Sequence, residues 1–123
     1  MIWHLQGNSK LKQSLRDIIE NPGNTLLVSQ FSLIEMSVKL KLGKLPEFIV
    51  TIEYITTQLL SDGFTILPIS NNHIFSYHLI PFFEDHRDPF DRFLLGTAFI
   101  EQIPIISIDD KFPRYRPLIA VID

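Results

Sequence analysis

Three short apolar runs, separated by longer stretches with helical periodicity, constrain this sequence more than any other feature. The runs occupy residues 25–29, 64–69 and 105–108, and each is mostly apolar along its whole length. Such runs are typical of strands that are buried on both faces of a parallel sheet. Parallel strands need long crossover connections, which are usually helices. The sequence therefore predicts an α/β chain with a central, mostly parallel sheet and helices on both faces, in three layers.

The expected helices follow from capping residues and from apolar spacing. Ser9, Ser29 and Asp88 suit N-caps, because their side-chain oxygens can accept hydrogen bonds from free backbone N–H groups. Asn71 or Asn72 suits the cap of a shorter helix. These signals predict helices over residues 10–20, 31–42, 48–60, 72–77 and 89–99, and a last edge strand over residues 118–122.

Composition excludes several classes of protein. The chain has 123 residues, 46% of them hydrophobic, which is enough for one core, so we expect a single domain over residues 1–123. There is no cysteine, which excludes a disulfide framework and fits a cytoplasmic protein. The net charge of −3 argues against a broadly basic nucleic-acid binder but allows an enzyme with a local basic groove. No apolar run reaches the roughly 18 residues that span a membrane.

The segment over residues 86–99 reads as the start of a buried helix that carries an unusually placed acid. Asp88 suits the N-cap, and Pro89 suits the first helical position, where a missing N–H costs nothing. Asp91 falls at the third position, as in a capping box with Asp in place of Glu. On a helical wheel it shares a face with Leu94 and Leu95. Asp91 is therefore either an acid stabilised by the positive helix end or a functional carboxylate.

Two further acids are expected at the same edge of the sheet, beyond the carboxyl ends of the strands, where such sheets bind ligands. Glu35 lies on the apolar stripe of its helix, and Asp109 directly follows the strand over residues 105–108. Taken singly, Glu35 can be explained by an ion pair with Lys39, and Asp109 by a turn. Together with Asp91, they favour a hard-cation site for Mg²⁺ or Mn²⁺, because a cation relieves the repulsion between carboxylates.

Three segments resemble the acidic motifs of one protein family. Residues 86–98, with Asp-Pro-Phe-Asp-Arg at 88–92, resemble the third acidic motif of PIN-domain ribonucleases, most closely the VapC-like toxins of bacterial toxin–antitoxin pairs. Residues 32–45, which begin Ser-Leu-Ile-Glu, resemble the second motif. Residues 106–112, Ile-Ser-Ile-Asp-Asp-Lys-Phe, resemble the fourth. The resemblance covers nearly the whole chain, and the spacing between the motifs agrees.

The resemblance implies a three-layer PIN-like fold in which Glu35, Asp91 and Asp109 are the catalytic, metal-binding acids. Asp88 and Asp110 are then possible accessory carboxylates. The implied cofactor is Mg²⁺ or Mn²⁺, the implied substrate is RNA, and the implied protein partners are a cognate antitoxin and a second copy of the chain. Four basic residues are candidates for phosphate contact at the rim of the site, although a solvated face explains them equally well: Lys39, Lys41, Arg92 and Lys111.

The sequence departs from the family at its start. Family members open with a hydrophobic strand that lies in the middle of the sheet and ends in Asp-Thr, and that Asp is the first metal-site acid. Here no acid occurs before Asp17. We therefore expect the first, central strand and its acid to be missing, either because the true start lies upstream or because this is a truncated relative. Residues 1–5 or a second chain would then fill the central position.

The expected function is a metal-dependent endoribonuclease, in which a metal activates water for in-line attack on an RNA phosphodiester. The missing acid supports an alternative, a catalytically impaired relative that only binds antitoxin or RNA. A metal-dependent phosphatase on a similar sheet is a third possibility, which activity on small phosphoesters but not on RNA would indicate. The four histidines have no metal-ligand spacing and are expected at the surface or in local hydrogen bonds: His4, His73, His78 and His86.

Overall fold

The computed structural model describes residues 1–3, 12–46 and 49–123. They contain a five-stranded sheet in the order β3-β2-β1-β4-β5, and every neighbouring pair of strands is parallel. This confirms the parallel α/β sheet that the sequence predicts. The strands are β1 (Ile2–Trp3), β2 (Leu27–Ser29), β3 (Thr65–Leu67), β4 (Ile105–Ile106) and β5 (Val121–Ile122).

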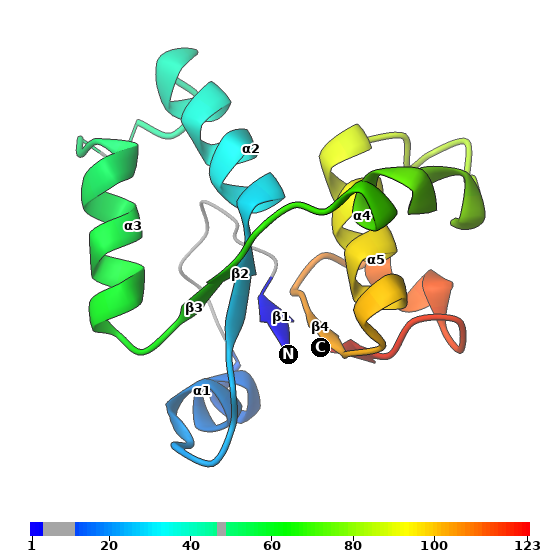
Figure 1. Cartoon of the computed structure of the whole chain (residues 1–123), viewed down its shortest axis with the longest axis horizontal. Helices are drawn as coiled ribbons and strands as arrows, with labels where there is room; N and C mark the ends of the chain where they lie inside the picture. Colours follow the sequence, from blue (N-terminus) through cyan, green and yellow to red (C-terminus); the bar gives the residue numbers. More distant parts are fainter. Residues whose placement is uncertain (4–11, 47–48) are drawn as a thin grey trace.

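Helices connect the strands and cover the sheet. In Figure 1, α2 and α3 lie on the left, α4 and α5 on the right, and α1 below them. Among the described residues, no helix has the length and apolar character needed to cross a membrane. The helices are α1 (Gln13–Glu20), α2 (Gln30–Lys41), α3 (Ile52–Ser61), α4 (Asn71–Phe75) and α5 (Pro89–Glu101), with 3₁₀ helices η1 (Ser76–Leu79) and η2 (Phe112–Tyr115).

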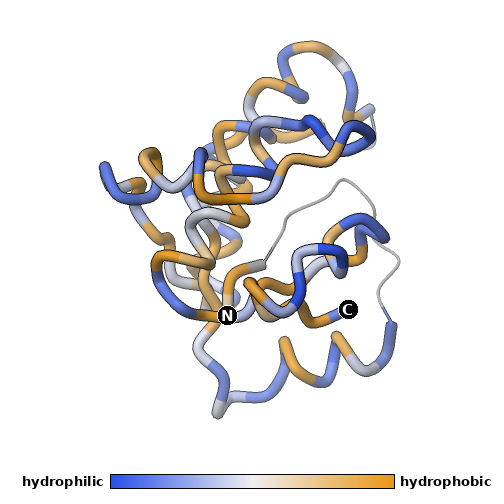
Figure 2. The backbone as a smooth tube through the Cα atoms, turned by 90° about the vertical axis from the view of Figure 1, so that its right-hand side faces the viewer, coloured by the Kyte–Doolittle hydropathy of each residue, from blue (hydrophilic) through white to orange (hydrophobic). Residues whose placement is uncertain are grey.

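Side chains that alternate along the strands enter two different cores. Ile105 belongs to the larger core, with Leu94 and Leu95 of α5, whereas the next residue, Ile106, packs with Leu15 of α1. All five side chains are at most 2% exposed. Because successive strand residues point to opposite faces, α5 and α1 cover opposite faces of the sheet, and the fold has three layers. The tube of α1, at the bottom of Figure 2, alternates between hydrophilic and hydrophobic stretches, as expected of a helix that covers one face.

Two of the predicted N-caps are confirmed. The Ser29 hydroxyl accepts a hydrogen bond from a backbone N–H at the start of α2, and Asp88 caps α5. The predicted cap Ser9 lies outside the described residues, as does the predicted start of the third helix at residue 48. Within the described part of the chain, α3 begins at Ile52 and is capped by Thr51.

The cap of α4 lies one residue earlier than predicted. The Ser70 hydroxyl accepts from the His73 backbone N–H at 3.2 Å, and His73 Nδ1 accepts from the Ser70 N–H at 3.1 Å. The prediction of Asn71 or Asn72 was wrong because this reciprocal capping box satisfies two backbone donors at once.

The middle of the sheet is held by β1. Ile2 pairs with Leu27 on one side and with Ile105 on the other, and its side chain is 0% exposed. Of the two alternatives expected for the central position, the structure therefore supports the first: residues 2–3 of this chain, and not a second chain, fill it. An empty slot would leave the facing edges of β2 and β4 without backbone partners, which is unfavourable inside a sheet.

We predict that Ile2→Ala lowers the free energy of unfolding by about 2–5 kcal/mol, because it leaves a cavity in the middle of the core. Ile49→Ala is the matched control, since Ile49 is 94% exposed. Chemical denaturation of both variants measures the difference. Equal stability of the two variants would show that Ile2 does not occupy the central strand.

Candidate functional site

The carboxyl ends of β2, β1 and β4 lie side by side and define the edge at which the predicted acids gather. The helix α2 begins directly after β2, and Glu35 lies in the second turn of α2, close to the carboxyl end of that strand. Asp91 lies in the first turn of α5, and Asp109 follows β4 after two intervening residues. Three segments that are far apart in the sequence thus bring carboxylates to one edge of the sheet.

Two groups of side chains meet there and share Asp91. Glu35, Asp88 and Asp91 form one group, and His86, Asp91 and Asp109 form the other. Within each group, one potential ligand atom per residue lies within 4.8 Å of the others. Exposure is only 5% for Glu35 and 7% for Asp91, so their repulsion is poorly screened by water. We call the four acids Glu35, Asp88, Asp91 and Asp109 the acidic cluster.

Asp88 has two roles in this arrangement. Its Oδ1 accepts from the backbone N–H groups of Phe90 at 2.8 Å and Asp91 at 3.2 Å, which confirms it as the cap of α5. The same side chain also offers an oxygen to the group that contains Glu35. A carboxylate that caps a helix has a second oxygen for another partner. Asp88 is therefore placed to serve both as a helix cap and as an accessory acid.

His86 is the part of the site that sequence reasoning missed. It is 4% exposed, and its Nε2 lies 2.8 Å from Asp91 Oδ2, so Asp91 pairs with this imidazole. The other ring nitrogen, Nδ1, lies 2.7 Å from the hydroxyl of Tyr115. Burial raises the pKa of the Tyr115 hydroxyl, which keeps it protonated. The position of His86 at the start of the third acidic motif, five residues before Asp91, was the one sequence feature that could have indicated its role.

Glu35 is held in an unfavourable environment for a charge. Burial raises the pKa of Glu35 above its ordinary value of 4.5, and the nearby Asp88 and Asp91 raise it further. Lys39 acts in the opposite direction, with its Nζ 3.3 Å from Glu35 Oε2. The ion pair with Lys39 expected from the i,i+4 spacing therefore exists, but it does not offset the burial.

The predicted RNA-contact residues differ in where they lie. Lys41 is exposed, Lys39 pairs with Glu35, and Lys111 Nζ donates to the Asp85 carbonyl at 2.5 Å. Asp110 is exposed and belongs to neither of the two groups of potential metal ligands. Of these three lysines, Lys41 alone falls in the exposed class, whereas Lys39 and Lys111 are partly buried.

Arg92, one of the candidates for RNA contact, lies in the interior of the protein. Arg92 is 4% exposed, and its guanidinium donates to the carbonyls of Tyr77, Ile80 and Pro81 at 2.8–2.9 Å. It also lies 4.6 Å from the centre of the Tyr77 ring. Because a planar guanidinium can satisfy several acceptors at once, Arg92 joins α5 to the end of η1 instead of facing the substrate side.

An exposed ion pair holds the loop in front of the site. Arg114 Nη1 and Nη2 bind the two carboxylate oxygens of Asp85 at 2.5 and 2.6 Å. This contact lowers the pKa of Asp85 from 3.8 to about 2. The loop that leads to His86 is thus tied to η2, which carries Tyr115.

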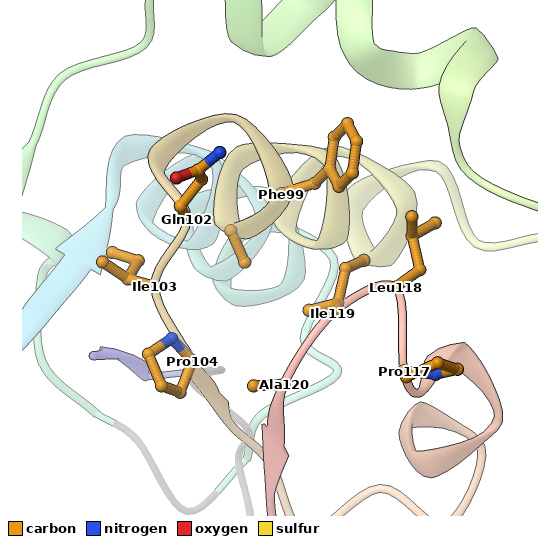
Figure 3. A pocket seen from close by; sticks show the side chains of 9 residues that line it. Phe99, Gln102, Ile103, Pro104, Pro117, Leu118, Ile119 and Ala120 are labelled. Atoms are coloured by element: carbon orange, nitrogen blue, oxygen red, sulfur yellow. The ribbon is translucent and has the colours of Figure 1, made fainter.

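Two pockets differ in the chemistry that they offer. One, of about 220 Å³, adjoins the acidic cluster. The other, of about 400 Å³, lies at the far end of α5, where Phe99, Leu118 and Ile119 are among the lining residues, and none of its side chains is charged (Figure 3). Of these two pockets, only the first is lined by both acidic and basic side chains. Its lining is Glu35, Val38, Lys39, Leu42, Lys44, Asp88, Pro89 and Phe90.

Fold and site together define a three-layer α/β protein with clustered acids at the carboxyl edge of a parallel sheet. The family model of the PIN domain matches residues 1–117. The chain therefore belongs to the PIN-domain family. A comparison with curated proteins gives no match.

Solved structures share this fold. The chain resembles one in the crystal structure of VapBC2 from Rickettsia felis bound to a DNA fragment from their promoter, with a TM-score of 0.64 and 18% identity over 99% of this chain and 98% of that one. A toxin–antitoxin complex from Klebsiella pneumoniae gives a TM-score of 0.62 and 18% identity over 99% and 95% of the two chains. At this identity the likeness concerns the fold.

We predict that Glu35→Gln raises the melting temperature of the metal-free protein at pH 7 by a few degrees. A raised pKa in the folded state means that stability falls as pH rises from 4.5 through that pKa. The advantage of Gln should therefore vanish below pH 4.5. Thermal unfolding at pH 4 and pH 7, without metal, measures this difference. Glu20→Gln, at an exposed position of α1, is the control, and a Glu35→Gln variant that melts no higher than wild type at pH 7 contradicts the prediction.

Proposed function

We propose that this chain is a VapC-like toxin of a toxin–antitoxin pair, a Mg²⁺- or Mn²⁺-dependent endoribonuclease that acts in the cytoplasm. The observation that carries the proposal is the convergence of three carboxylates, those of Glu35, Asp88 and Asp109, on a fourth, Asp91, at the carboxyl edge of a PIN-domain sheet. Two of these carboxylates are almost fully buried. Two of the solved structures with a similar fold are VapBC2 from Rickettsia felis and a toxin–antitoxin complex from Klebsiella pneumoniae.

The donor set fits a hard divalent cation. Carboxylate oxygens are the ligands that Mg²⁺ and Mn²⁺ prefer. The raised pKa of Glu35 reflects burial and the nearby Asp88 and Asp91 charges, which a cation between these groups would balance. Glu35, Asp91 and Asp109 would hold the metal. When bound, it would lower the pKa of a water molecule for attack on a phosphodiester and stabilise the charge that develops.

Asp88 is the fourth carboxylate of the site in this proposal. No acid precedes Asp17 in the sequence as given. Asp17 is an exposed side chain on α1, and its Oδ1 accepts a hydrogen bond from Gln13 Nε2 at 2.8 Å. Asp88, in contrast, shares a group with Glu35 and Asp91. Asp88 thus supplies this carboxylate from the N-cap of α5.

Lysines beside the acidic cluster would hold the RNA backbone. Lys39 and Lys44 line the same pocket as Glu35 and Asp88, and Lys41 is exposed nearby on α2. Lysine contacts to phosphate position a strand without reading its sequence. Lys111, which is partly exposed, stands on the other side of the cluster, in the segment that follows Asp109.

An antitoxin and a second copy of the chain are the proposed protein partners. Ile34, Val38 and Leu42 form an exposed apolar stripe on α2 and are 44–61% exposed. Val38 and Leu42 also line the pocket beside Glu35. An antitoxin segment on this stripe would cover the acidic cluster and silence the enzyme.

A second reading is a catalytically impaired relative that only binds antitoxin or RNA. The division of the acids between two groups that share only Asp91 favours it. An incomplete set of ligands would orient water poorly, and a misplacement of about 1 Å can cost roughly a hundredfold in rate. The two readings agree on the fold and on metal binding but differ in RNA cleavage.

We predict that Mn²⁺ raises the melting temperature of the wild-type chain by mass action and that Asp91→Asn abolishes this rise. The amide of Asn retains the size of the side chain but not its charge. Asp17→Asn, on α1, is the control and should respond to Mn²⁺ like wild type. Equal metal responses in all three proteins would refute the proposed site.

Single-turnover cleavage of a structured RNA, with Mn²⁺ or with EDTA, separates the two readings. The enzyme reading predicts cleavage by wild type that needs Mn²⁺ and is lost in Asp91→Asn. A wild type that binds Mn²⁺ but leaves RNA intact supports the impaired relative. Cleavage by Asp91→Asn at the wild-type rate overturns the assignment of Asp91.

A further inference from the structure

His86 joins the acidic cluster to a segment that supplies none of its carboxylates. Hydrogen bonds run from Tyr115 in η2 to the imidazole of His86, and from there to Asp91. Tyr115 is 1% exposed, His86 4% and Asp91 7%, so the whole chain of hydrogen bonds is buried. Buried polar side chains fix one another's orientation when each has its partners.

The direction of these hydrogen bonds is determined by the groups at the two ends. A carboxylate oxygen only accepts, so His86 Nε2 donates to Asp91 Oδ2. In a neutral imidazole, Nδ1 is then an acceptor, and the Tyr115 hydroxyl donates to it. Both ring nitrogens are engaged, which leaves the imidazole one orientation.

Packing holds the same two residues in place. The His86 ring lies 5.6 Å from the Tyr115 ring and 5.7 Å from the Phe112 ring, measured between centroids. Phe83 packs edge-on against Tyr115 at 5.2 Å, and the Phe83 carbonyl accepts from the His86 N–H at 3.0 Å. The His86 side chain is thus fixed by the segments on both sides of it.

We propose that His86 and Tyr115 are positioning residues, which hold the Asp91 carboxylate in the orientation that binds a divalent cation together with the other acids. This inference rests on the proposed function. Histidine and hydroxyl groups behind a metal ligand orient it, and their loss typically lowers metal affinity tenfold to a hundredfold. Without the imidazole, Asp91 Oδ2 would lose the hydrogen bond from His86, and its carboxylate would be held less firmly in the orientation that binds metal.

Two substitutions at His86 separate its two hydrogen bonds. Gln places an N–H donor near the position of Nε2, whereas Asn reaches only the position of Nδ1. His86→Gln therefore keeps the contact with Asp91, and His86→Asn loses it. Tyr115→Phe keeps the ring packing and removes only the hydroxyl. Calorimetric titration of the full chain with Mn²⁺ measures the affinity of each variant.

His73→Asn is the matched control. His73 is 2% exposed, and its Nε2 lies 2.8 Å from an oxygen of Glu101, so it is also a buried histidine paired with a carboxylate. Glu101 lies at the other end of α5 from Asp91, roughly 15 Å along the helix axis. This variant measures the effect of losing a buried imidazole without disturbing the acidic cluster.

We expect His86→Asn to bind Mn²⁺ tenfold to a hundredfold more weakly than wild type, His86→Gln to recover most of the affinity, and Tyr115→Phe to lie between them. His73→Asn should bind Mn²⁺ like wild type although it is less stable. In RNA cleavage, the deficit of His86→Asn should shrink as Mn²⁺ reaches saturation. Melting temperatures without metal separate these effects from loss of fold.

The outcomes distinguish this inference from the proposed function. A wild-type chain that binds no Mn²⁺ overturns the metal site and the positioning role together. A wild type that binds Mn²⁺, with His86→Gln and Tyr115→Phe both within twofold of it and His86→Asn equally tight, overturns the positioning role alone. If His86→Asn does not fold, Tyr115→Phe decides, since unchanged Mn²⁺ affinity in that variant contradicts the role of the hydroxyl.

Discussion

Burial of the Asp91 carboxylate is the constraint on which the site and much of its surroundings depend. At 7% exposure this side chain has lost most of its water, which is costly unless charges or hydrogen bonds replace it. His86 donates one hydrogen bond, and the N-terminus of α5 adds its positive end. Asp88 caps the same turn and brings a further negative charge close. The start of α5 is therefore both a helix terminus and half of the candidate metal site.

Features encoded by neighbouring residues could be predicted from the sequence. A strand or a helix start depends mainly on residues close to it in the sequence. The apolar run over residues 105–108 predicted β4, and the capping residues Ser29 and Asp88 predicted the starts of α2 and α5. The placement of Asp109 after a strand followed from a general property of parallel sheets, whose carboxyl ends meet at one edge. Local chemistry and one topological rule were enough for the architecture and for the approximate position of the acids.

Features that depend on distant partners could not be predicted. The hydrogen bond between His86 and Tyr115 joins residues that are 29 positions apart, and no motif or spacing in the sequence predicts it. Arg92 stands within an acidic motif, and only the carbonyls at the end of η1 explain why it points inward. The strand β1 has two residues, too few to show a pattern, and its neighbours on both sides define it. Each of these contacts exists only once the chain has folded back on itself.

The pairing of Ile2 with Ile105 brings together two residues that are more than a hundred positions apart in the sequence. During synthesis the N-terminal part emerges first, so β1 gains its second neighbour only after more than a hundred residues have been made. Asp109 and Tyr115 leave the ribosome later still, and parallel pairing between distant segments is slow to form. A nascent fragment thus carries Glu35 without the groups that complete the cluster. The order of synthesis therefore delays assembly of the site until Asp109 and Tyr115 have both been made.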